Sequence, residues 1–287
     1  MENLFSRIDR SPAWSQIIPL GLTLVVLAGL ITILHATILI LNAFPNTESI
    51  LLRIRWYDVV VGMTVYLKTS IDFAILMGRL MATYPGWRGR VAIEIGSAFG
   101  NAIGTIAIIA LWVTLKHVDV LLALMVFVAA LVLFELAHGS LDHLTDWESE
   151  TGFKKNIYVS LHVFLDGINR FTDPVLSRVM PDLGENLRGK MGLTWTGLLT
   201  FSMTVPFVLG LDDFAGYVPL FSVVNVYGFA VGVIVAHTIL NIALFLSPRH
   251  TIVAVKNEWV ALLGALAFIG LAIYGLVEVG KILIEVF

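Results

Sequence analysis

The sequence contains no cysteine and few charged residues. Of its 287 residues, only 14% are charged, whereas 58% are hydrophobic. Soluble domains average about 25% charged residues, so this composition excludes a soluble enzyme and predicts an integral membrane protein. The lack of cysteine excludes disulfides, thiolate metal sites and iron–sulfur clusters. The net charge of −3 provides no basic surface for nucleic acid.

Seven apolar stretches are long enough to cross a bilayer as α-helices, which takes about 20 residues each. We therefore expect an all-α integral membrane fold of seven transmembrane helices in contact with the lipid bilayer. In the fifth helix, Pro206 and Pro219 with the glycines between them predict a break. The seven stretches are residues 17–42, 58–82, 92–115, 118–136, 194–221, 226–247 and 258–280.

Lys and Arg are distributed unequally between the two sides of these helices. Thirteen lie on the side that holds the N-terminus, and four lie on the other side. The positive-inside rule then places the N-terminus in the cytoplasm and the C-terminus outside, for a cell (inner or plasma) membrane. The long segment 137–191 becomes cytoplasmic and offers a surface for a cytoplasmic partner. Within it, residues 156–171 have the apolar spacing of a helix that lies at the membrane interface.

The segment 137–191 divides the last six helices into two sets of three, which predicts a repeat inverted in the membrane. A shift of 140 residues places Asp72 on Asp212 and Asn101 on Asn241. Coincidence among scarce polar residues is the alternative explanation. On the repeat hypothesis the chain has four parts: an N-terminal lead-in with a peripheral transmembrane helix (1–57), a first three-helix repeat (58–136), the connecting segment (137–191) and a second three-helix repeat (192–287).

Acidic residues inside predicted spans are the first candidates for an ion path, because charge near the bilayer centre is costly. Asp72 and Asp212 each lie deep in a predicted helix, and Asp213 adds a third carboxylate. Lys68 precedes Asp72 by four residues, so a purely structural ion pair on one helix face is the alternative.

Two further helix faces carry polar side chains. Glu94, Ser97 and Asn101 share one face, and His237 and Asn241 share another. Carboxylate and amide oxygens suit Ca²⁺, Mg²⁺ and Mn²⁺, and a histidine shifts the preference toward Mn²⁺ or a heavier metal. A buried hydrogen bond explains His237 equally well.

The end of helix 118–136 carries a third polar cluster. Glu135, His138 and Asp142 share one helix face there, ahead of further acidic residues. One E-xx-H motif resembles half of a carboxylate-bridged dimetal site, which requires two such motifs. A solvated acidic helix end is the alternative, and a cytoplasmic antechamber for cations is the functional interpretation. Separately, the glycines at 96, 100 and 104 predict close approach of another helix.

The stretches TSIDFAILMG, with Asp72, and LGLDDFAGYV, with Asp212 and Asp213, resemble the acidic motifs of the lysine exporter (LysE) superfamily. That superfamily includes cadmium and manganese exporters, TerC proteins and Gdt-type manganese/calcium–proton exchangers. The resemblance covers about residues 58–280 and implies two inverted three-helix repeats and a transport function. The chain lacks the E-x-G-D-[KR]-[TS] signature of the exchangers and has Asp72-Phe73 where TerC proteins have Asp-Asn.

The sequence therefore predicts a secondary transporter, not an enzyme, that exports a divalent metal cation in exchange for protons and holds no permanent cofactor. No Walker A motif is present to supply ATP-driven transport. The alternatives are an exporter of an organic cation or amino acid, and a non-transporting anchor subunit; a homo-oligomer is compatible with each. The expected ion and metal ligands are Asp72, Asp212 and Asp213; Ser97, Asn101, His237 and Asn241 would complete the site, and Glu94 or Glu135 would relay protons.

Overall fold

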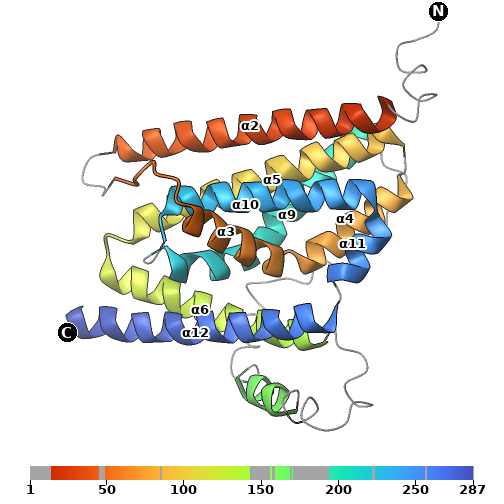
Figure 1. The fold of residues 1–287 in the computed structure, drawn as a ribbon. Coiled ribbons are helices and arrows are strands. Elements are labelled where there is room, and N and C mark those ends of the chain that lie inside the picture. Colours follow the sequence, from red (N-terminus) through yellow and green to blue (C-terminus); the bar gives the residue numbers. More distant parts are fainter. Residues whose placement is uncertain are drawn as a thin grey trace, which may run out of the picture. The chain divides into compact units, whose positions relative to one another are not determined.

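The computed structural model of the chain describes residues 14–44, 49–84, 86–142, 156, 159–168, 170, 194–221, 224–255 and 257–286. Within these ranges, only the backbone is described at residues 72, 140, 142, 207–216, 255, 258, 260 and 261. Every regular element in the described part of the chain is a helix (Figure 1). The predicted all-α class is therefore confirmed.

Helices occupy each of the seven predicted apolar stretches. Among the described residues, five helices are long and apolar enough to cross a membrane, or six if the bent pair α3–α4 forms one span. The protein is therefore a multi-pass membrane protein, while the number of seven spans stays a prediction. The helices are α2 (Trp14–Asn42), α3 (Trp56–Thr69), α4 (Ile71–Thr83), α5 (Trp87–Leu115), α6 (Asp119–Asp142), α9 (Trp195–Tyr217), α10 (Val226–Leu246), α11 (Pro248–Val255) and α12 (Glu258–Val286), with a 3₁₀ turn, η1 (Val218–Leu220), after α9.

The predicted helix break lies in a different span from the one expected. The backbone of α9 is helical from Trp195 to Tyr217 with Pro206 inside it, because one proline removes a single backbone donor and a long helix can continue past it. Instead, α3 and α4 meet at a bend of 68°. At the bend, the Thr69 hydroxyl donates to the carbonyls of Val65 and Tyr66, at 3.3 and 3.1 Å, while the Ser70 N–H keeps its helical bond to the Tyr66 carbonyl at 2.9 Å.

The described chain forms two compact units, of which the first comprises residues 1–110, 192–210 and 223–253. In it, α3 and α10 cross at very close range. A Cβ atom added to Gly62 would lie 2.2 Å from the Phe229 carbonyl oxygen, and one added to Gly232 would lie 2.2 Å from the Val59 carbonyl oxygen. Glycine at both positions therefore allows the two backbones to touch.

A buried carboxylate connects the starts of these two helices. Asp58 is fully buried and accepts hydrogen bonds from Arg55 Nε at 2.7 Å and from Arg55 Nη2 at 2.9 Å. It also accepts from the backbone N–H of Asn225 at 3.0 Å. The Asn225 side chain in turn caps α10 by accepting from the N–H of Gly228 at 3.0 Å. The charge of Asp58 is thus compensated while it fixes α10 against α3.

The glycine pattern of α5 has the packing role that its spacing predicts. A Cβ atom at Gly100 would lie 2.1 Å from the Met203 carbonyl oxygen, and one at Gly96 would lie 2.5 Å from the Leu199 carbonyl oxygen. Both contacts bring α9 against α5. Gly104, the third member of the pattern, has no heavy atom within 4 Å of such a Cβ.

The second unit comprises residues 111–191, 211–222 and 254–287. Its centre is the packing of α6 against α12, which lie side by side in Figure 1. Gly275 of α12 lies within van der Waals reach of Val126, Ala130 and Pro219. Each unit takes helices from both predicted repeats, and compact units need not follow repeats. The predicted domain boundaries at 58, 137 and 192 therefore remain a prediction.

Candidate functional site

The site is centred on His237, which lies on α10 in the first unit. The His237 side chain is 1% exposed. Its Nδ1 is hydrogen-bonded to the Tyr66 hydroxyl of α3, and its Nε2 lies 2.9 Å from Asn241 Nδ2, one helical turn along. The Phe73 ring of α4 packs on the imidazole at a centroid distance of 5.3 Å. The histidine therefore bridges α3 and α10 in an apolar environment.

Asn241 extends this contact to α5. It is 1% exposed, and its Nδ2 also donates to the Ser97 hydroxyl at 3.0 Å. Ser97 is fully buried, and its hydroxyl lies 3.1 Å from the backbone carbonyl of Glu94. The result is a continuous buried chain of polar groups from three helices: Tyr66, His237, Asn241 and Ser97.

The orientation of the Asn241 amide and the tautomer of His237 depend on each other. With Nδ2 donating to both Ser97 and His237 Nε2, a neutral imidazole would carry its proton on Nδ1, next to Tyr66; the opposite tautomer goes with the rotated amide. A second proton on His237 Nε2 would need an acceptor in place of the amide N–H. The Asn241 oxygen supplies one if the amide rotates by half a turn.

Glu94 is a buried acid that lies next to this chain. It lies on α5, is 3% exposed, and is hydrogen-bonded to the Thr23 hydroxyl of α2. The same hydroxyl lies 3.0 Å from the Pro19 carbonyl oxygen. A threonine hydroxyl has one proton. If it donates to Pro19, Glu94 must be protonated in order to donate to Thr23; if it donates to Glu94, the carboxylate can be ionised.

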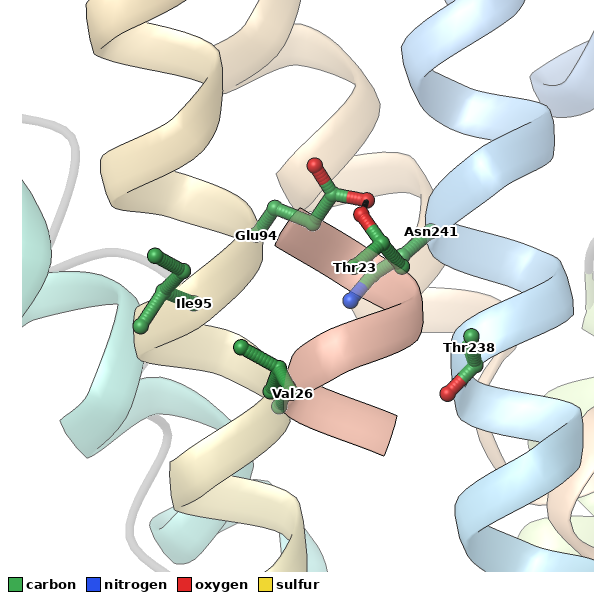
Figure 2. A pocket seen from close by; sticks show the side chains of 7 residues that line it. Thr23, Val26, Glu94, Ile95, Thr238 and Asn241 are labelled. Atoms are coloured by element: carbon green, nitrogen blue, oxygen red, sulfur yellow. Dashed lines mark hydrogen bonds between the residues drawn. The ribbon is translucent and has the colours of Figure 1, made fainter. Parts of the chain in front are cut away.

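Glu94 and Asn241 line the same small cavity. Figure 2 shows both side chains with Thr23 from α2 and Thr238 from α10 around it, and apolar atoms of Val26 and Ile95 on the other side. A carboxylate, an amide and two hydroxyls thus converge on one space inside the first unit. The cavity has room for about one water molecule, so these groups suit the transfer of protons and not the binding of a hydrated cation.

The predicted site residues have different outcomes. Ser97, His237 and Asn241 are in direct contact, and Glu94 joins them at the cavity. Asn101 is buried on α5, one turn beyond Ser97. Glu135 lies on α6 in the second unit. The side chains of Asp72, Asp212 and Asp213 are outside the described residues, and their role as ion and metal ligands remains a prediction.

Two contributing residues are absent from the sequence-based site. Tyr66 is a tyrosine within an apolar run, and its partner is 171 residues away in the sequence. Thr23 lies in the helix interpreted as peripheral, yet it reaches Glu94. A search for hydroxyl groups on apolar helices would have included both residues, among many others.

The backbone places Asp72 at the bend of the α3–α4 pair. It is the second residue of α4, directly after the break at Ser70. The first turn of a helix has unpaired N–H groups and a partial positive charge, which stabilise a carboxylate.

Comparisons with known proteins give no relative of this chain: no family model, no curated protein and no solved structure matches it.

Proposed function

We propose that the protein is a proton-coupled secondary transporter that exports a divalent metal cation. The observation that carries the proposal is the buried polar chain from Tyr66 through His237 and Asn241 to Ser97, next to the cavity of Glu94. Polar and ionisable groups inside membrane helices are costly and usually belong to a transport or proton path. The Thr23–Glu94 and His237–Asn241 pairs each have two hydrogen-bonding arrangements that differ by one proton.

In this proposal Asp72, Asp212 and Asp213 bind the metal, and Asn101 completes its coordination. A carboxylate that binds a metal must be deprotonated, so the cation and protons compete for the same groups. The bend between α3 and α4 favours this role for Asp72, because broken helices are the usual place of ion binding in secondary transporters.

The architecture we propose is a pair of inverted repeats of the LysE type. Three pairs of helices begin 139 residues apart: α3 and α9 at Trp56 and Trp195, α5 and α10 at Trp87 and Val226, and α6 and α12 at Asp119 and Glu258. The helix packing is consistent with the same correspondence between the two sets. The first helix of each set packs on the second helix of the other set, through Gly62 and Gly232 in one case and Gly96 and Gly100 in the other. The third helices, α6 and α12, pack on each other.

Flux in reconstituted vesicles tests this function. Purified protein is placed in liposomes that contain a pH-sensitive dye, and Mn²⁺, Cd²⁺ or Zn²⁺ is added outside. We expect metal-driven proton movement in the wild type, at least tenfold less in His237→Gln and in Asp72→Asn, and wild-type flux in the exposed-turn control His117→Gln. Flux driven by lysine or arginine alone would favour the organic-cation exporter. Absence of flux with every solute would favour the anchor subunit.

A further inference from the structure

A second group of metal-binding side chains lies outside the polar chain, at the end of α6 in the second unit. His138 of α6 faces His162 and Asp166 of the short helix Val159–Ile168. His138 Nε2 lies 2.8 Å from Asp166 Oδ1, and His162 Nδ1 lies 3.4 Å from Asp166 Oδ2. One ligand atom from each of the three residues can be chosen so that all three atoms lie within 4.8 Å of one another.

The spacing of these residues holds them in place for binding. His162 and Asp166 are four residues apart, so they project from the same face of one helix, the arrangement by which helices chelate metals. The two histidine rings pack edge to face at 4.7 Å. One turn before His138, Phe134 packs against Phe164 at 6.1 Å, while Leu165 is fully buried. Apolar contacts thus dock the short helix on α6 independently of any ion.

The chemistry of the three ligands selects the class of metal. Two imidazoles and one carboxylate are typical ligands of first-row transition metals, whereas Ca²⁺ and Mg²⁺ prefer oxygen alone. Around Zn²⁺, with ligand bonds of about 2.0–2.2 Å, tetrahedral ligand atoms are about 3.4 Å apart. The Asp166 Oδ2–His162 Nδ1 pair already has this spacing, and the Asp166 Oδ1–His138 Nε2 pair is closer, at 2.8 Å. A pair of ligand atoms at the upper limit of 4.8 Å would have to approach by about 1.4 Å. The Asp166 side chain is 58% exposed, so the surrounding atoms leave room for this adjustment.

We propose that His138, His162 and Asp166 bind a first-row divalent transition metal ion, with water completing the coordination. The ion would join the short helix Val159–Ile168 to the end of α6, on the predicted cytoplasmic side. The site is separate from the proposed transport site because it shares no residue with it. A cation exporter would meet its cargo at this position before the ion enters the membrane, so this role of the site rests on the proposed function, whereas the binding itself does not.

Metal titration of the full-length protein in detergent tests the site, with any affinity tag removed. Zn²⁺ binding is measured by calorimetry, and Co²⁺ binding by its visible absorption bands, which report nitrogen and oxygen ligands directly. The lack of cysteine removes thiolate binding from both signals. The variants are His162→Ala and Asp166→Asn, and the matched control is His117→Ala, which removes an exposed histidine outside the site.

We expect both site variants to lose at least tenfold in Zn²⁺ affinity and to lose the Co²⁺ bands, while His117→Ala behaves as the wild type. Equal affinity in all four proteins, or no Zn²⁺ binding by the wild type, would overturn the site. The Asp72→Asn variant separates the two proposals. If it loses flux and keeps the His162-dependent binding, both proposals hold. Binding without flux in the wild type supports the site alone, and flux with unchanged binding in His162→Ala supports the transporter alone.

Discussion

Gly62 of α3 and Gly232 of α10 make reciprocal contacts, each lying against the backbone of the other helix. A Cβ atom on either would meet a carbonyl oxygen at 2.2 Å. Tyr66 lies one turn beyond Gly62, and His237 lies five residues beyond Gly232. The close crossing of the two helices therefore sets the distance over which Tyr66 reaches the imidazole of His237.

Alanine at Gly62 or Gly232 should separate α3 from α10. Because backbone atoms cannot move as a flexible side chain can, we expect each variant to lose about 1–3 kcal/mol of stability and to weaken the Tyr66–His237 contact. Thermal unfolding in detergent measures the loss. Gly21→Ala on α2 is the control, since its Cβ meets no atom within 4 Å; equal melting of all three variants would contradict the packing argument.

Asp58 should matter more for stability than any exposed ion pair. Asp58→Ala leaves the N–H of Asn225 and the Arg55 guanidinium without their acceptor. The Arg55 side chain is 45% exposed and can turn to water, so the expected loss of stability, about 1–3 kcal/mol, comes from the Asn225 N–H that loses its acceptor. Glu278→Gln breaks the surface pair with Lys281, at 3.2 Å, and should change stability by about 1 kcal/mol or less. An equally small loss of stability in both variants would show that Asp58 does not hold α10 against α3.

Tyr66→Phe should separate a structural role of the polar chain from a role in transport. The variant keeps the ring that packs edge to face on His237 but removes the hydroxyl next to Nδ1. If the polar chain carries protons, metal-driven proton flux should fall several-fold, while the free energy of unfolding should fall by about 1–3 kcal/mol at most. Flux equal to the wild type, at equal protein amount, would assign the hydroxyl to packing alone.

The sequence predicts helix faces well and contacts between helices poorly. His237 and Asn241 were expected on one face because helical periodicity depends only on local spacing, and they are adjacent in the structure. Tyr66 and Thr23 were not expected, because their partners lie on other helices and periodicity carries no information on which helices meet. The bend at Ser70 was not expected either, because proline and glycine signals favour residues 206–219 and residues 63–77 contain neither of these residue types.

Labelling tests the predicted orientation, on which the cytoplasmic position of the metal site depends. The chain has no cysteine, so a single introduced cysteine reports its own side of the membrane. Ser160→Cys, exposed on the connecting segment, should react with an impermeant reagent only after the cells are opened. Val118→Cys, exposed between α5 and α6, should react from outside intact cells. The reverse pattern would refute the thirteen-to-four charge argument.

Glu94 offers the sharpest test of proton coupling, because its hydrogen bond and its charge can be removed separately. Glu94→Gln keeps a side chain of the same size that can donate to, or accept from, Thr23, but it cannot release a proton. Thr23→Val keeps the volume of Thr23 and the titration of Glu94 but removes the hydroxyl between Glu94 and Pro19. If Glu94 carries a transported proton, Glu94→Gln should abolish the pH dependence of metal flux with little change in stability, whereas Thr23→Val should shift that dependence and leave it present.

Flux of both variants is measured in the same vesicles at several external pH values. Should Glu94→Gln retain the wild-type pH profile, the buried carboxyl would be structural, and the proton would have to move through His237 and the aspartates alone.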